Sequence, residues 1–158
     1  MLSISNCQTR FQLDPGNLGA MTRSAYYLGA EAIIISGRNS APLSAVCLKA
    51  AAGAAEYIPT YEYTNSLTFL NGSKDNGWKF YAAVPPIANG DQKVPKAKIA
   101  RTLDESQVGR ALLEGPCCLI LGQEGQGLRP WLANHADYRV GIAKGDDTDP
   151  MVDSLNVS

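Results

Sequence analysis

The feature of this sequence that most constrains its fold is an alternation between short apolar runs and longer amphipathic stretches. Strands are predicted in the short runs, at residues 9–14, 32–36, 57–61, 78–84, 117–122 and 137–142. Helices are predicted between them, at residues 17–29, 42–56, 64–73, 102–115 and 127–136. Apolar strands that alternate with helices favour a parallel sheet covered on both faces. The sequence therefore predicts an α/β fold, with a parallel sheet of about six strands flanked by helices.

Composition and charge exclude several classes of protein. With 158 residues, 45 % of them hydrophobic and 18 % charged, the chain is long enough for one domain with its own core and is not of the disordered type. The formal net charge of −1 does not mark the domain as a whole as a nucleic-acid binder. The longest apolar runs have the length of a strand, so no membrane span is expected.

One local exception to this neutral balance is the run KVPKAKIAR at residues 93–101, which holds four positive charges and no acid. Such a run is either a solvated surface loop or a contact for an RNA backbone. Both interpretations stay open from the residues alone, and Lys93 and Lys96 are the candidates for RNA contacts.

The four cysteines and the single histidine do not follow a metal-binding pattern. Cys117 and Cys118 are adjacent and no CxxC spacing occurs, which is typical of thiols that fill a core in a reducing compartment. No metal is expected. Nucleophilic chemistry between one of these thiols and His135 stays open as an alternative.

Open parallel sheets bind ligands at the carboxyl ends of their strands, so residues that directly follow predicted strands are candidates for a site. After the first strand, DPGNLGAMTR combines a turn, a helix capped by Asn17, and Arg23. After the sixth strand, a polar loop leads into Ser154 and Asn156, small side chains that suit either a helix cap or a ligand contact.

A glycine-rich turn, LGQEGQGL, follows the fifth predicted strand. Gly122, Gly125 and Gly127 have the spacing GxxGxG, which is neither the dinucleotide fingerprint nor a phosphate loop. Such a turn still brings backbone N–H and C=O groups close to a ligand, and it places Glu124 in its middle.

Together, DPGNLGAMTRSA, LGQEGQG and DPMVDSLNVS closely resemble, in this order, the three signature motifs of the SpoU-type RNA ribose methyltransferases. The resemblance covers nearly the whole chain, and the segments NSAPLS and KAAAGAAE are most similar to the mitochondrial large-subunit rRNA members. It implies a SPOUT fold over residues 1–158 with a C-terminal trefoil knot, S-adenosylmethionine as cofactor, large-subunit rRNA as substrate, a homodimer and a mitochondrial location. Relatives continue SLNVS into a helix that completes the knot, so this helix is expected to be missing here.

The same resemblance implies roles for individual residues. The catalytic positions are Arg23, Glu124, Ser154 and Asn156. The cofactor-binding positions are Leu121, Gly122, Gly125, Gly127, Ile142, Leu155 and Asn156. The RNA-binding positions are Asn17, Arg23, Lys93 and Lys96. Because arginine is effectively never neutral in a protein, we expect Arg23 to orient a phosphate and stabilise charge on the 2′-oxygen rather than act as a base.

Two departures from the family pattern and three alternatives bear on this interpretation. Ala51 stands where relatives tend to have serine, and the loop AKGDDTDPM is longer than its usual counterpart. The chain could instead be a catalytically silent SpoU-like module for RNA binding or ribosome assembly, or could methylate another rRNA or tRNA ribose. A Rossmann-like or flavodoxin-like nucleotide binder is disfavoured by the GxxGxG spacing.

Overall fold

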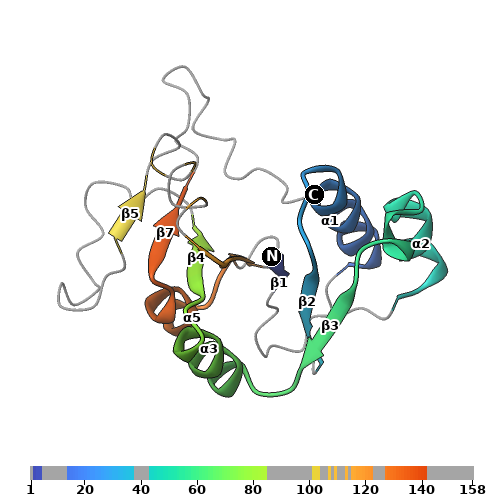
Figure 1. Cartoon of the computed structure of the whole chain (residues 1–158). Helices are drawn as coiled ribbons and strands as arrows, with labels where there is room; N and C mark the ends of the chain where they lie inside the picture. The colour runs from blue at the N-terminus through green and yellow to red at the C-terminus, as the bar shows by residue number, and fades with distance from the viewer. Residues whose placement is uncertain are drawn as a thin grey trace, which may run out of the picture.

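A parallel sheet forms the centre of the fold (Figure 1). The computed structural model describes residues 2–4, 14–37, 43–84, 101–103, 107, 109, 113, 115–122 and 127–141. The strands within these residues are β1 (Leu2–Ile4), β2 (Ile33–Ser36), β3 (Thr60–Tyr63), β4 (Lys79–Ala83), β5 (Arg101–Leu103), β6 (Cys117–Leu121) and β7 (Tyr138–Val140). They lie in the order β3-β2-β1-β6-β4-β7-β5, and all neighbouring pairs are parallel. The predicted α/β class with a parallel sheet is confirmed, with seven strands in the described part of the chain.

The strands differ from the prediction in three places. Of the strand predicted at residues 9–14, only Asp14 is among the described residues. Asp14 is the N-cap of α1, so the predicted C-terminal end of this strand is wrong. β1 and β5 were not predicted, because each has only three residues and neither shows a clear apolar alternation. β3 begins at Thr60 rather than at residue 57, because a short 3₁₀ helix ends just before it.

The helices of the described residues are α1 (Pro15–Tyr27), α2 (Ala45–Ala51), η1 (Ala54–Glu56), α3 (Ser66–Asp75) and α5 (Pro130–His135). The predicted helix over residues 102–115 is wrong at its start, since Thr102 and Leu103 belong to β5, while Gln107 and Gly109 are helical. Among the described residues, no helix combines the length and the apolar character that a membrane crossing requires.

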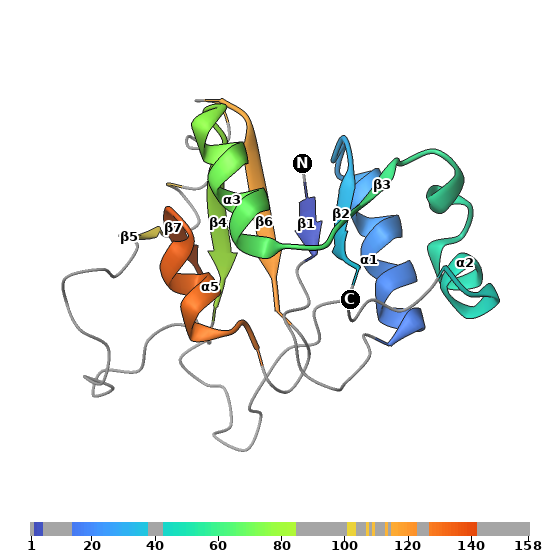
Figure 2. The same ribbon diagram turned by 90° about the horizontal axis from the view of Figure 1, so that it is seen from below.

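The two faces of the sheet carry separate apolar clusters. On one face, α1 and α2 pack on β2 through Leu18, Met21, Ile33 and Cys47 among others. On the other face, α3 and α5 cover β4 and β6, and the buried residues include Phe80. Figure 2 shows this division, with α3 and α5 at one half of the sheet and α1 and α2 at the other. The predicted arrangement of helices on both faces is confirmed.

The first turn of α1 is held by Asp14 rather than by the predicted cap, Asn17. The Asp14 carboxylate accepts a hydrogen bond of 2.9 Å from the backbone N–H of Asn17, and Pro15 occupies the first helical position. The prediction of Asn17 as the cap is therefore wrong by three residues, because the acceptor side chain precedes the proline. The predicted stop at Gly29 is confirmed, since its φ of 78° directly follows the helix end.

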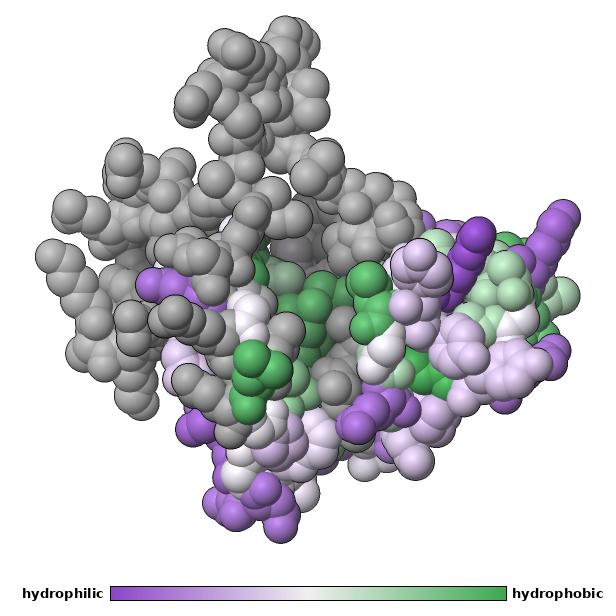
Figure 3. Space-filling view, turned by 45° about the horizontal axis from the view of Figure 1, so that its top comes forward, coloured by the Kyte–Doolittle hydropathy of each residue, from purple (hydrophilic) through white to green (hydrophobic). Residues whose placement is uncertain are grey.

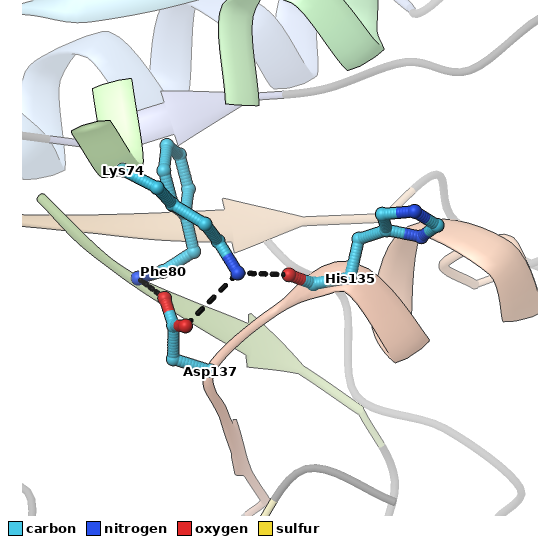
Figure 4. Close-up of polar contacts among 4 residues, drawn as sticks. All are labelled: Lys74, Phe80, His135 and Asp137. Atoms are coloured by element: carbon cyan, nitrogen blue, oxygen red, sulfur yellow. Dashed lines mark hydrogen bonds and ion pairs between the residues drawn. The ribbon is translucent and has the colours of Figure 1, made fainter. Parts of the chain in front are cut away.

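A carboxylate joins α3, β4 and the start of β7 (Figure 4). Asp137 accepts a hydrogen bond of 2.8 Å from the backbone N–H of Phe80 and forms an ion pair of 2.9 Å with Lys74. The Lys74 ammonium also donates to the carbonyl oxygen of His135 at 2.6 Å. One acidic side chain thus links three elements that are far apart in the chain.

We expect Asp137→Ala to lower the free energy of unfolding by about 2–3 kcal/mol, because it removes the acceptor of a buried strand N–H as well as the ion pair. Asp75→Ala, an exposed acid in the last turn of α3, is the control and should change stability by less than about 0.5 kcal/mol. Urea denaturation measures both. Equal stabilities of the two variants would contradict the role of Asp137.

Candidate functional site

The ends of four strands form one edge of the sheet. Ile4 at the end of β1 lies opposite Leu121 at the end of β6, and Ala83 at the end of β4 lies opposite Val140 at the end of β7. The intervening pair, Ala82 and Ile120, joins β4 to β6 in the same register. The carboxyl ends of these neighbouring strands therefore lie in one row, where open parallel sheets place their ligands.

The glycine turn begins at this edge with a backbone-to-backbone contact. A Cβ atom on Gly122 would collide with the carbonyl carbon of Gly127 and come within 2.5 Å of the amide nitrogen of Leu128. Gly127 has a φ of 65°, in the left-handed region that favours glycine. The two ends of the turn are thus in direct contact, and a side chain at Gly122 would meet backbone that cannot move aside cheaply. This explains the residue type at both positions.

The first and second sequence motifs meet at this edge. Leu121, the last residue of β6, packs against the apolar cluster that contains Leu18 and Met21 of α1. α1 also carries the predicted site residues Asn17 and Arg23. The structure therefore joins the helix of the first motif and the end of the strand that leads into the glycine turn in one apolar cluster.

Asn17 and Arg23 differ in their surroundings. Asn17 is partly buried in the first turn of α1, whereas Arg23, six residues later, is exposed. The side chain of Arg23 is exposed and has no hydrogen bond or ion pair with the described residues, so its guanidinium is accessible to an anionic ligand. A buried hydrogen bond of 2.8 Å from Thr22 Oγ1 to the Leu18 carbonyl oxygen lies on the core-facing side of the helix.

Several predicted site residues lie outside the described part of the chain. They are Lys93, Lys96, Glu124, Gly125, Ile142, Ser154, Leu155 and Asn156. The segment of the predicted trefoil knot, which begins beyond β7, lies outside it as well. Of the predicted positions, the described structure thus contains Asn17, Arg23, Leu121, Gly122 and Gly127.

Sequence reasoning missed two features of the strand-end edge. The end of β4 at Ala83 lies between β6 and β7, although no site residue was predicted directly at the end of that strand; strand order is not readable from one sequence. Arg139, one residue before the end of β7, is only 8 % exposed and donates to Asn134 Oδ1 at 2.7 Å. Its Nε has no hydrogen-bond partner among the described residues. In the sequence, the signal that could have identified Arg139 was a basic residue within a predicted strand.

Cys47 and Cys118 are buried, whereas Cys117 is only partly buried. Cys47 is fully buried, and burial raises the pKa of its thiol, which favours the neutral, unreactive form. Cys118 is buried as well, whereas His135 is exposed and its Nδ1 lies 2.7 Å from the carbonyl oxygen of Trp131 in the same helix. No group of three metal-binding side chains occurs among the residues that the structure describes.

Comparisons with known proteins agree with this arrangement. The model of the SpoU rRNA Methylase family matches residues 12–158. The chain is 37 % identical over 152 residues to "rRNA methyltransferase 1, mitochondrial" of Saccharomyces cerevisiae, covering 92 % of this chain and 36 % of that protein. It is 33 % identical over 146 residues to the 23S rRNA (guanosine-2′-O-)-methyltransferase RlmB of Yersinia pestis, covering 92 % of this chain and 50 % of that protein.

A solved structure with a similar fold is the AdoMet-bound rRNA methyltransferase from Sinorhizobium meliloti. It superposes with a TM-score of 0.68 at 26 % sequence identity, over 99 % of this chain and 49 % of that one. The chain thus spans half or less of the length of each of these three proteins.

We expect Gly122→Ala to lower the free energy of unfolding by about 1–3 kcal/mol, because the added methyl group meets backbone atoms. Gly72→Ala is the matched control: Gly72 lies in α3 with open space where its Cβ would stand. There the same change should raise stability by about 0.5–1 kcal/mol, through helix propensity. Urea denaturation distinguishes the two. A neutral effect of Gly122→Ala would mean that the turn does not close on its backbone.

Proposed function

The chain belongs to the SpoU rRNA Methylase family, and we propose that it transfers a methyl group from S-adenosylmethionine to the ribose 2′-hydroxyl of a guanosine in large-subunit rRNA. The names of the relatives support the reaction: the Yersinia pestis protein is a guanosine 2′-O-methyltransferase of 23S rRNA. The observation that carries the proposal is that Leu121 of the second motif packs against the apolar cluster that includes Leu18 and Met21 of the first motif.

The residues at the strand-end edge suit the proposed cofactor. Gly122 is closed against the backbone of Gly127 and Leu128, whereas Gly127 has open space where a Cβ would stand, so a ligand could approach the main chain closely at Gly127. We propose that Leu121, Gly122, Gly125 and Gly127 hold the cofactor from this turn. Ile142, Leu155 and Asn156 are proposed to hold it from the segment after β7. When bound, S-adenosylmethionine supplies an electrophilic methyl group on a sulfonium.

Arg23 is proposed to act on the RNA side of the reaction. A ribose hydroxyl is a weak acid, so its oxygen gains negative charge as the new C–O bond forms. The guanidinium of Arg23 is exposed and permanently charged, and it can hold a phosphate oxygen and stabilise this developing charge. Asn17, Lys93 and Lys96 are proposed as further RNA contacts.

The remaining catalytic positions are proposed from the motifs alone. Glu124 would fix Arg23 or the glycine turn through its carboxylate, and Ser154 and Asn156 would donate hydrogen bonds toward the ribose and across the site. Each is a polar side chain in a segment that follows a strand, where open parallel sheets place their ligands.

We also propose that residues 1–158 form one SPOUT domain with a C-terminal knot, that it acts as a homodimer, and that the protein works in mitochondria. Relatives such as the yeast mitochondrial enzyme at 37 % identity support this location, although the Yersinia pestis enzyme is similar at 33 %. In the proposed dimer, Arg23 would serve the cofactor site of the partner.

We expect Arg23→Ala to reduce methylation of a large-subunit rRNA transcript about 10²–10³-fold, because one electrostatic contact to the transition state is lost. Binding of S-adenosylmethionine, measured by calorimetry, should stay within about twofold of wild type, because Arg23 is assigned to RNA. Arg23→Lys keeps the charge but not the forked geometry, and should recover part of the rate.

Lys49→Ala, an exposed cation on the neighbouring helix α2, is the control and should methylate like wild type. Mass spectrometry of nuclease digests locates the methylated ribose. Undiminished methylation by Arg23→Ala would refute the role of Arg23, and failure of the wild-type chain to bind S-adenosylmethionine would refute the proposed reaction.

A mixture of subunits tests the dimer. Arg23→Ala and Asn156→Ala subunits, each inactive alone, should regain about a quarter of the wild-type rate when refolded together, since half of the dimers then contain one complete site. Methylation by the mixture is compared with each variant alone. No recovery would mean that each subunit uses its own arginine.

A further inference from the structure

Three tyrosine side chains are exposed at the end of α1. Tyr26 and Tyr27 are the last two residues of this helix, and they are 47 % and 87 % exposed. Tyr57, which follows η1, is 71 % exposed. Single exposed apolar residues are common on protein surfaces, but several large rings gathered in one place are typical of a surface that binds a partner.

The three rings differ in how much of them a ligand can reach. Tyr26 and Tyr57 stack on each other, with ring centroids 5.7 Å apart and an angle of 24° between their planes. Tyr27 makes no ring contact with the residues that the structure describes. Tyr27 is therefore the ring whose face is open to a ligand, beside a stacked pair that fixes Tyr26.

Arg23 lies on the same side of α1 as Tyr27. Residues four apart on a helix are neighbours, with about 6 Å between their Cβ atoms. Both side chains are exposed, and the Arg23 guanidinium has no hydrogen bond or ion pair with the described residues. A permanent cation beside an open aromatic ring is the combination that binds single-stranded nucleic acid, because the cation holds a phosphate while the ring stacks on a base.

The charges around the three rings favour one direction for a bound strand. Glu56 directly precedes Tyr57 and is exposed. Its carboxylate repels phosphates from the side of η1, whereas Arg23 attracts them along α1. A bound strand would therefore extend from Tyr27 toward Arg23, and Tyr57 would support Tyr26 without contacting the strand.

We propose that Tyr27 stacks on an unpaired base of the RNA substrate while Arg23 holds a phosphate next to that base. The inference rests on the proposed methylation of rRNA and adds to it a residue that positions the substrate. A second copy of the chain could also cover an exposed ring. However, a two-fold contact centred on this face would bring two Arg23 guanidinium groups together, and their like charges disfavour it.

Two single strands with equal charge test the stacking. Oligoadenylate of about 10 nucleotides carries bases and phosphates, whereas an abasic strand of the same length carries only the phosphates. The chain should bind oligoadenylate about 10-fold more tightly than the abasic strand, measured by fluorescence anisotropy at one salt concentration. Tyr27→Ala should remove most of this difference, and Tyr27→Trp should keep it, because either ring stacks on a base. Arg23→Ala should weaken the binding of both strands equally.

Tyr57→Ala is the matched control, since it removes another exposed tyrosine ring beside an acid. It should change the binding of either strand by less than about twofold. With the large-subunit rRNA transcript, Tyr27→Ala should raise KM about 10-fold and leave kcat and the binding of S-adenosylmethionine unchanged, because the stacking is present before and during the reaction. A wild-type chain that methylates no RNA would refute the proposed reaction, while the binding of the two strands still decides the role of Tyr27.

The inference is overturned if Tyr27→Ala keeps the preference for oligoadenylate, or if it weakens the binding of both strands to the same extent. It is also overturned if Tyr27→Ala sediments as a smaller species than the wild-type chain at the same concentration. In that case the ring belongs to a contact between two copies of the chain.

Discussion

The register of the parallel sheet is the constraint on which the rest of the structure depends. Because Ile4 pairs with Leu121 and Ala83 with Val140, four strands end side by side, and every segment that leaves them starts from one edge. Motifs more than 90 residues apart in the sequence are brought to one region by the strand pairing, and Leu121 then packs against the apolar cluster that includes Leu18 and Met21 of α1. A slip of one residue in β6 would turn Leu121 away from α1.

Packing then decides how close the segments at this edge approach each other. α1 can lie close to α2 because Gly19 has no side chain: a Cβ there would be 2.7 Å from that of Ala50 and would collide with the carbonyl oxygen of Cys47. Gly122 has the same function at the glycine turn. In both places the absence of a side chain, not a favourable contact, sets the distance between main chains, so substitution acts mainly through steric cost.

Figure 3 shows the apolar residues gathered toward the middle of this view, with hydrophilic ones along the lower and outer margins.

The sequence predicted the class of fold and part of the site, for reasons that individual residues make clear. Buried runs such as those of β2 and β6 are continuous and apolar, so they were readable as strands of a covered parallel sheet. β1 and β5 were not readable, because three residues carry too little pattern and their pairing comes from distant strands. The glycine spacing indicated a close turn at Gly122, but only the structure identifies its contact as the peptide between Gly127 and Leu128. A pocket on the face that α3 covers is lined by both Tyr61 and Trp78, a proximity without any local signal.

The two faces of the sheet have different chemical characters, and this follows from where its crossovers lie. The connections from β1 to β2 and from β2 to β3 carry α1 and α2 over one face, while α3 and α5 connect β3 to β4 and β6 to β7 over the other. α3 must pass β2, β1 and β6 to reach β4, and it lies near β4 because Asp137 fixes its last turn through Lys74. Near β2 and β3, this face of the sheet is covered by aromatic side chains from β3 and α3. These side chains leave a pocket between them. The pocket is thus a consequence of the same strand order that aligns the four strand ends.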